Sequence, residues 1–290
     1  MDGSRRARRR RRQWTQAAGF SLLTVAAVFT TLPIALVVFI ILRRGLAAIT
    51  PEFLLAFPTN GLRDGGILPA ILGTVYLTFL MTLVVAPLGI AAGIYLAHYA
   101  PDNRLTRSIR VAILNLAGIP SVVYGLFGLA FFVIFFQMGT SVLAGALTLA
   151  IMTLPVVITT TEEALRSVPN SFHVVSVSLG GTDWQSVRRI LLPQGLPGIM
   201  TGVILGVERA AGETAPILFT AAAVYLPHLP TSPLDPTMAL PYHLYVVSTQ
   251  IPGMPGEVQY GTAAVLLILV LLMNVIATII RSRARAQRRW

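Results

Sequence analysis

Long apolar runs recur along the whole chain, separated by short segments that carry most of the charged residues. A helix needs about 20 consecutive apolar residues to cross roughly 30 Å of hydrocarbon. Spans that meet this requirement are predicted at 17–42, 67–97, 109–136, 141–161, 199–225 and 261–280. The pattern therefore predicts an all-α, polytopic membrane protein with six transmembrane helices.

The first apolar run directly follows a block of arginines, as the apolar region of a secretory signal does. Residues 17–42 form a longer run than the roughly 7–15 apolar residues of such a signal, and no small-residue cleavage site follows. We interpret 1–16 as an Arg-rich cytoplasmic tail and 17–42 as a retained first transmembrane helix.

Composition supports the membrane assignment. The 290 residues are 55% hydrophobic and 11% charged, whereas a soluble domain has about 25% charged residues. The net charge of +11 comes from arginine, because the chain has no lysine. A basic chain can bind nucleic acid, but the distribution of these arginines along the chain indicates a different role.

Most arginines fall in four blocks that flank predicted spans. The blocks are Arg5–Arg12; Arg104, Arg107 and Arg110; Arg166, Arg188 and Arg189; and Arg281–Arg289. By the positive-inside rule these segments are cytoplasmic, and an even number of spans places both termini on that side. We therefore predict a multi-pass membrane protein with both termini cytoplasmic, a basic cytoplasmic tail at 282–290, contacts to membrane lipid and no nucleic-acid partner.

Segment 226–259 contains no basic residue and seven prolines, so it is predicted to be an external loop and not a span. Within it, Ala239–Thr249 is apolar and aromatic enough to form a short helix along the membrane surface.

The predicted span 199–225 carries three ionisable residues: Glu208, Arg209 and Glu213. Each costs about 2.5–3.5 kcal/mol on membrane-insertion scales. Arg209 and Glu213 are four residues apart and can pair on one helical face, whereas Glu208 points about 100° away from Arg209. Two interpretations remain open: an ion pair that fixes helix packing, or a polar wall of a transport pathway, in which arginine suits an oxyanion.

The cytoplasmic loop 162–198 has the pattern of a protruding helix-turn-helix. Gly180 and Gly181 are expected to end one helix, and a second is expected to begin near Thr182 or Asp183. Val187, Ile190 and Leu191 fall on one face of that helix, and Pro193 and Pro197 are expected to end the unit. Such a unit can dock in a groove of a soluble partner or rest on the bilayer surface.

Patterns typical of enzymes are absent from the sequence. There is no His-Glu-x-x-His, no Gly-x-Ser-x-Gly, no Walker lysine and no cysteine. The histidines are predicted to lie in loops scattered over both faces without forming a metal set: His98, His173, His228 and His243. We therefore expect a protein that is not an enzyme, with no metal site and no cofactor bound by this chain.

The cytoplasmic loop resembles the coupling motif of ABC importer permeases, in which Glu-Ala-Ala is followed by Gly and then Ile-x-Leu-Pro. The later positions match, and Val174, Val175 and Ser176 stand where the motif has Glu-Ala-Ala. The resemblance implies that ATPase coupling involves Ser178, Leu179, Gly180, Gly181, Asp183, Ile190, Leu192 and Pro193.

Five further stretches resemble the A-type permease of the phosphate-specific transport (Pst) system. They are Gly65–Thr74, Pro87–Leu96, Asn115–Leu129, Leu154–Ile158 with Thr161–Pro169, and Arg209–Pro216, and the loop phrase Met238–Tyr245 is similar to the same type. His98 departs from the family, in which an acidic residue usually precedes the Tyr-Ala pair. The resemblance covers the chain from Gly65 onward and implies a MetI-like permease domain at 65–281.

By this resemblance the chain lies in the bacterial cytoplasmic (inner) membrane and pairs with a C-type permease. It receives phosphate from an external phosphate-binding protein and is driven by two ATPase subunits that hold ATP and Mg²⁺. Arg209 and Glu213 match family positions implicated in passing the anion. Two alternatives stay open: a permease for another oxyanion or a phosphonate, and a non-transporting structural or sensory subunit, which Val174 makes plausible.

Overall fold

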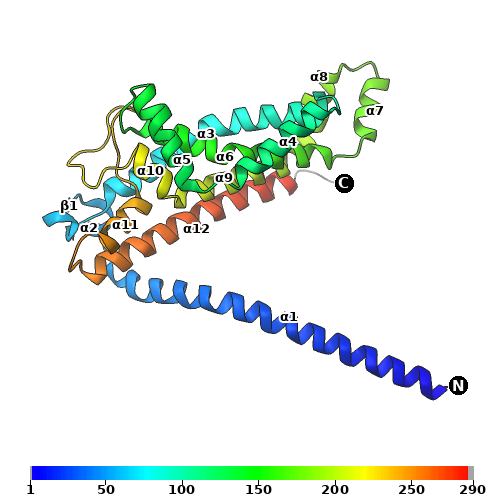
Figure 1. The fold of residues 1–290 in the computed structure, drawn as a ribbon, viewed down its shortest axis with the longest axis horizontal. Coiled ribbons are helices and arrows are strands. Elements are labelled where there is room, and N and C mark those ends of the chain that lie inside the picture. The colour runs from blue at the N-terminus through cyan, green and yellow to red at the C-terminus, as the bar shows by residue number, and fades with distance from the viewer. Residues whose placement is uncertain (1, 287–290) are drawn as a thin grey trace.

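The computed structural model describes residues 2–286 and is mainly helical (Figure 1). The long helices are α1 (Asp2–Gly45), α3 (Leu68–Ile94), α4 (Arg104–Ala117), α6 (Val142–Arg166), α9 (Leu192–Gly212) and α12 (Gly256–Ala286). Shorter helices are α2 (Pro51–Leu55), α5 (Ser121–Gly128), α7 (Ser171–Ser178), α8 (Asp183–Ser186), α10 (Ala215–Thr220) and α11 (Leu240–Thr249). A small hairpin pairs β1 (Pro58–Thr59) with β2 (Asp64–Gly65).

Five helices are long and apolar enough to cross a membrane, at Gly19–Ala48, Leu68–Tyr99, Val142–Arg166, Asp183–Gly212 and Gly256–Ile279. Three of them include or continue into short turns: η1 (Leu46–Ala48), and the wider π-helical turns η3 (Tyr95–Tyr99) and η5 (Val187–Leu191). The prediction of a polytopic helical bundle is confirmed.

The predicted span 109–136 is not one helix, which corrects that prediction. α4 and the segment formed by α5 and the π-helical turn η4 (Leu129–Phe135) meet at an angle of 99°. Pro120 lies in the break between them, where it supplies no amide donor. The Tyr124 hydroxyl donates to the Leu116 carbonyl at 2.8 Å and so satisfies a backbone group near the end of α4. Among residues 2–286 the structure therefore has five single helices with the length and composition of a span, and six such spans if the bent pair counts as one.

The predicted span 199–225 also has different bounds in the structure. One continuous helix runs through α8, η5 and α9 from Asp183 to Gly212, and α10 follows after a break. Pro193 and Pro197 lie within this continuous helix, so the prediction that they end the unit is wrong. The wider turn η5 ends at Leu191, two residues before Pro193, and accommodates a ring that removes one helical hydrogen bond.

Helix α6 occupies the centre of the bundle and packs against α3 and α9. Small residues allow the close approach: a Cβ added to Gly89 of α3 lies 2.6 Å from Val157 of α6. The core between these helices includes Met81, Leu149 and Met152, which are almost fully buried.

At one end of the bundle, α2, β1 and α11 lie together (Figure 1). The predicted segment 239–249 forms α11, and its Leu240, Val246 and Val247 are buried against neighbouring helices. Ala239 at the start of α11 offers no side-chain cap. Instead, Thr74 of α3 accepts the Leu240 amide N–H at 2.8 Å, so another helix caps α11.

Helix α1 diverges from the rest of the bundle (Figure 1). It approaches α12 where Gly45 meets the Tyr260 carbonyl, and the described side chains between Gly19 and Leu36 are exposed. Helix α1 begins at Asp2, so residues 2–16 of the predicted tail form its first part. Met1 lies outside the described residues, and so do residues 287–290 of the predicted tail 282–290. Figure 1 shows the start of α1, the end of α12 and the α7–α8 turn at the same end of the molecule.

Candidate functional site: a charged helix break and the α7–α8 turn

The two charged residues predicted to pair lie at the break between α9 and α10. Arg209 Nε approaches Glu213 Oε1 at 3.4 Å, which confirms the predicted pairing. The predicted span 199–225 includes Glu213 in one continuous helix. In the structure Glu213 lies instead at the C-terminal cap of α9, where its backbone is extended (φ −76°, ψ 133°). Pro216 explains the break, because a proline at the start of α10 cannot supply the amide that a continuous helix requires there.

The two partners of this pair have different surroundings. Glu213 lines a small internal cavity with Thr74 and Thr78 of α3 and Pro241 of α11, and 18% of its side chain is exposed. The Arg209 side chain is 37% exposed, and its terminal nitrogens have no hydrogen-bond partner among the described residues. The carboxylate therefore faces the protein interior while the guanidinium offers donors outward.

Glu208 is not brought together with this pair. It lines an otherwise apolar groove of about 250 Å³ between α9 and α12, beside Val207 and Met273. Its place on a different face of α9 agrees with the 100° step between consecutive helical residues.

The predicted coupling residues lie on both sides of the turn between α7 and α8. Gly180 has a φ of +83°, a left-handed conformation that favours glycine, and it ends α7 as expected. Thr182 begins α8 through a capping box with Gln185. Ser178, Leu179 and Gly181 flank this turn, Asp183 starts α8, and Ile190, Leu192 and Pro193 follow in the continuous helix.

This turn exposes a group of apolar side chains. Val174, Val175, Val177, Leu179 and Trp184 are all exposed, and Leu179 reaches 84%. On the inner face, Val187 and Leu191 are buried against Leu165 and Ile199, so the turn is anchored to the bundle by its second helix. An exposed apolar patch of this kind indicates a surface for a partner or for lipid.

One polar cluster was not predicted from the sequence. Glu162 of α6 is buried, and its Oε1 accepts from Arg110 Nε of α4 at 2.7 Å and from Arg166 Nε at 2.9 Å. Both arginines also donate to the Leu96 carbonyl of η3. In the sequence these arginines indicated topology, and only the spacing of four between Glu162 and Arg166 signalled a possible pair.

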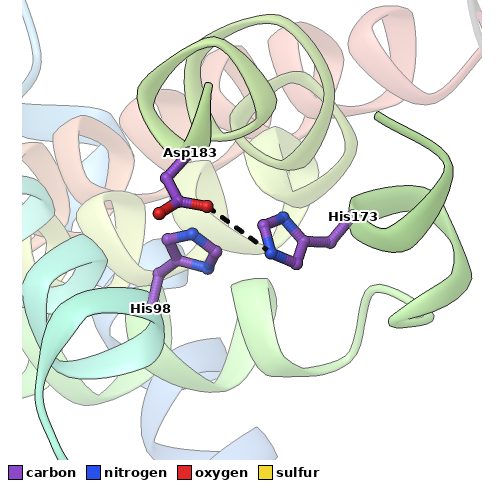
Figure 2. Close-up of side chains that lie close together, drawn as sticks. All are labelled: His98, His173 and Asp183. Atoms are coloured by element: carbon purple, nitrogen blue, oxygen red, sulfur yellow. Dashed lines mark ion pairs between the residues drawn. The ribbon is translucent and has the colours of Figure 1, made fainter. Parts of the chain in front are cut away.

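The prediction that the histidines are scattered in loops is wrong for three of them. His243 lies in α11 and is buried. His98 of η3 and His173 of α7 lie side by side near Asp183 of α8 (Figure 2), with ring centroids 4.7 Å apart. Tertiary packing joins residues 75 positions apart, which no sequence spacing reveals.

Comparisons with known proteins agree with this architecture. The family described as "binding-protein-dependent transport system inner membrane component" matches residues 89–286. The chain belongs to this family. A probable ABC transporter permease, YqgI of Bacillus subtilis, is 36% identical, covering 87% of this chain and 90% of the relative. A probable phosphate transport system permease protein, PstA of Methanocaldococcus jannaschii, is 38% identical, covering 87% and 88% respectively.

Two solved structures share the fold of these permeases. A bacterial ABC transporter that imports the acidic polysaccharide alginate has a TM-score of 0.66 at 14% identity, covering 96% of this chain and 99% of that chain. An inward-facing MetNI methionine ABC transporter has a TM-score of 0.61 at 20% identity, covering 74% and 94%. The prediction of a MetI-like fold is confirmed. The chain is a multi-pass inner-membrane permease subunit of an ABC importer, which is a non-enzymatic role. This role implies permease, ATPase and binding-protein partners in general.

Proposed function

We propose that this permease subunit imports inorganic phosphate. The observation that carries the proposal is the Arg209–Glu213 pair, whose guanidinium directs unpaired donors outward from a helix break. Its planar fork of donors fits a phosphate oxyanion. Phosphate transport permeases such as the Methanocaldococcus jannaschii protein and the PstA of Pasteurella multocida, which is 33% identical and covers 89% of this chain, support the same substrate.

Transport proceeds by alternating access in this proposal. ATP-driven closure of two partner ATPase subunits moves the turn around Gly180, and the bundle shifts so that Arg209 faces first the outside and then the cytoplasm. The exposed Leu179 and Trp184 supply apolar contacts for an ATPase groove. ATP and Mg²⁺ are held by those partners, and an external phosphate-binding protein delivers the anion.

The proposed complex places a C-type permease against the bent α4–α5 pair. This pair exposes apolar side chains on both of its arms, including Leu114, Val123 and Phe127.

In the proposed orientation both termini and the α7–α8 turn are cytoplasmic. Their location at the same end of the molecule (Figure 1) and the arginine blocks support this orientation.

The test is ATP-dependent uptake of labelled phosphate into vesicles that contain the reconstituted complex. We expect uptake that excess sulfate does not reduce, and a loss of at least about tenfold in Arg209→Ala, as expected for removal of a charge-assisted contact worth about 1.5–3 kcal/mol. Arg107→Ala is the matched control, since Arg107 is also an exposed arginine but lies in α4.

The outcomes separate substrate from site. If the native complex moves no phosphate, the substrate assignment is wrong, and competition by sulfate or a phosphonate identifies another oxyanion. If phosphate uptake survives Arg209→Ala in an assembled complex, the Arg209–Glu213 pair is structural. If Glu208→Gln abolishes uptake while Arg209→Ala does not, the pathway follows the α9–α12 face instead.

A further inference from the structure

Three potential metal ligands meet where the end of α3 contacts the α7–α8 turn (Figure 2). His98 comes from η3, His173 from α7 and Asp183 from the first position of α8. One ligand atom from each residue lies within 4.8 Å of the other two, and His173 Nε2 is 3.8 Å from Asp183 Oδ1. We propose that His98, His173 and Asp183 form a binding site for a transition-metal ion of the Zn²⁺ class.

The spacing suits a small tetrahedral ion. Zn²⁺ binds imidazole nitrogen and carboxylate oxygen at about 2.0–2.2 Å, which holds neighbouring ligand atoms about 3.3 Å apart in a tetrahedron. The His173–Asp183 separation is within about 0.5 Å of this value. Asp183 is exposed, so rotation of its side chain can bring the carboxylate closer to both imidazoles.

The donor set selects the class of metal. Two imidazoles and one carboxylate favour Zn²⁺ and its neighbours Co²⁺ and Ni²⁺ over Mg²⁺ or Ca²⁺, which prefer oxygen ligands. Three protein ligands leave a fourth position for solvent or for a group of a docked partner.

A further contact orients the His173 ring for this role. His173 Nδ1 lies 3.0 Å from the hydroxyl of Ser186, a fully buried residue. When Nδ1–H donates to this hydroxyl, Nε2 is unprotonated and directed toward Asp183. The His98 ring packs edge-on against both His173 and Tyr99, which restricts its rotation.

A bound ion joins the end of α3 to both sides of the Gly180 turn. Without the ion, His173 Nε2 and Asp183 Oδ1 lie 3.8 Å apart across that turn. Binding holds α7, α8 and η3 in one arrangement, and therefore opposes any movement of the turn relative to the bundle. This regulatory consequence rests on the proposed coupling role of the turn, whereas metal binding itself does not.

The binding test uses the full chain in detergent, purified without a polyhistidine tag and titrated with ZnCl₂ in a calorimeter. We expect one Zn²⁺ per chain in the native protein, and affinity at least about 100-fold weaker in His98→Ala and in His173→Ala. His228→Ala is the matched control and is expected to bind as the native chain does, because His228 lies between α10 and α11 and is not among the three clustered ligands. Ser186→Ala is expected to bind about 10-fold more weakly, as loss of an orienting contact does.

Co²⁺ gives an independent readout of the ligand set, since its tetrahedral complexes absorb visible light and d¹⁰ Zn²⁺ does not. The native chain and His228→Ala are expected to show this absorption, and His173→Gln is expected to lose it. Thermal unfolding without metal verifies that each variant is folded. A native chain that binds Zn²⁺ no more tightly than His173→Ala, or that loses its site in His228→Ala, overturns the proposal.

The regulatory consequence is measured as ATPase activity of the assembled complex with and without micromolar Zn²⁺. Zn²⁺ is expected to lower the activity of the native complex at least twofold and to leave that of His173→Ala unchanged. Equal inhibition of both overturns the regulatory role. Phosphate uptake is not part of either readout, so failure of the substrate proposal and failure of this one are distinguishable.

Discussion

The cap that α3 provides to α11 gives a sharp prediction for Thr74→Val. This substitution keeps the shape of the side chain and removes the hydroxyl that accepts the Leu240 amide N–H at 2.8 Å. Leu240 is fully buried and Thr74 is 3% exposed, so water does not replace the lost acceptor. A buried donor without a partner costs about 1–3 kcal/mol, which is roughly 5- to 150-fold in the unfolding equilibrium.

Thr78→Val is the matched control, one turn further along the same helix. Thr78 is equally buried, but its hydroxyl donates only to the carbonyls of Thr74 and Val75 within α3. Its loss leaves no buried N–H unpaired, and we expect a cost below about 1 kcal/mol.

The assay is thermal unfolding of both variants in detergent, together with hydrogen–deuterium exchange of the peptide that contains Leu240. Thr74→Val is expected to unfold at least about 2 °C below Thr78→Val, using about 2–4 °C per kcal/mol. Exchange at the start of α11 is expected to rise in Thr74→Val alone. Equal destabilisation by the two substitutions, or unchanged exchange at Leu240, refutes the capping argument.

Three further predictions concern buried or strained groups. Burial lowers the pKa of His243 to about 4, so the free energy of unfolding of the native chain falls by about 3 kcal/mol as the pH drops from 6.5 to 4. In unfolding curves measured across this pH range, His243→Leu is expected not to show this decrease. Gly180→Ala places a side chain at a φ of +83° and is expected to reduce ATPase stimulation severalfold, whereas Gly139→Ala, equally strained at +65° but outside the α7–α8 turn, leaves it intact. Glu162→Gln weakens two arginine contacts, one to a half-exposed arginine, and is expected to lower the free energy of unfolding by about 2 kcal/mol, against less than about 0.5 kcal/mol for exposed Glu163→Gln.

Local signals in the sequence predicted much of the architecture. Hydropathy located the spans, because lipid requires long apolar helices. Gly180 and Thr182 marked the end of α7 and the start of α8, because each has a local conformational role at a helix terminus. The pairing of Arg209 with Glu213 followed from their separation of four residues.

Other features depend on contacts between distant segments. Pro193 was predicted to end a helix, but the wider turn η5 accommodates it and the helix continues. Val187 and Leu191 of η5 are buried against the bundle, a contact that the local sequence does not specify. Gly118 and Pro120 lie within the predicted span 109–136, yet their residue types do not specify a bend of 99°. The meeting of His98 with His173 similarly requires the folded arrangement of α3 and α7.

In the proposed transport mechanism, the continuous helix from Asp183 to Gly212 acts as a mechanical lever. Arg209 lies 26 residues beyond Asp183, which at 1.5 Å per residue is a distance of roughly 39 Å along the helix axis. If the helix pivots at its Asp183 end by about 10°, the other end sweeps about 7 Å, more than twice the donor–acceptor distance of a hydrogen bond. A small rotation imposed at the α7–α8 turn is therefore enough to carry the Arg209 guanidinium from one set of neighbours to another, without any change in the helix itself.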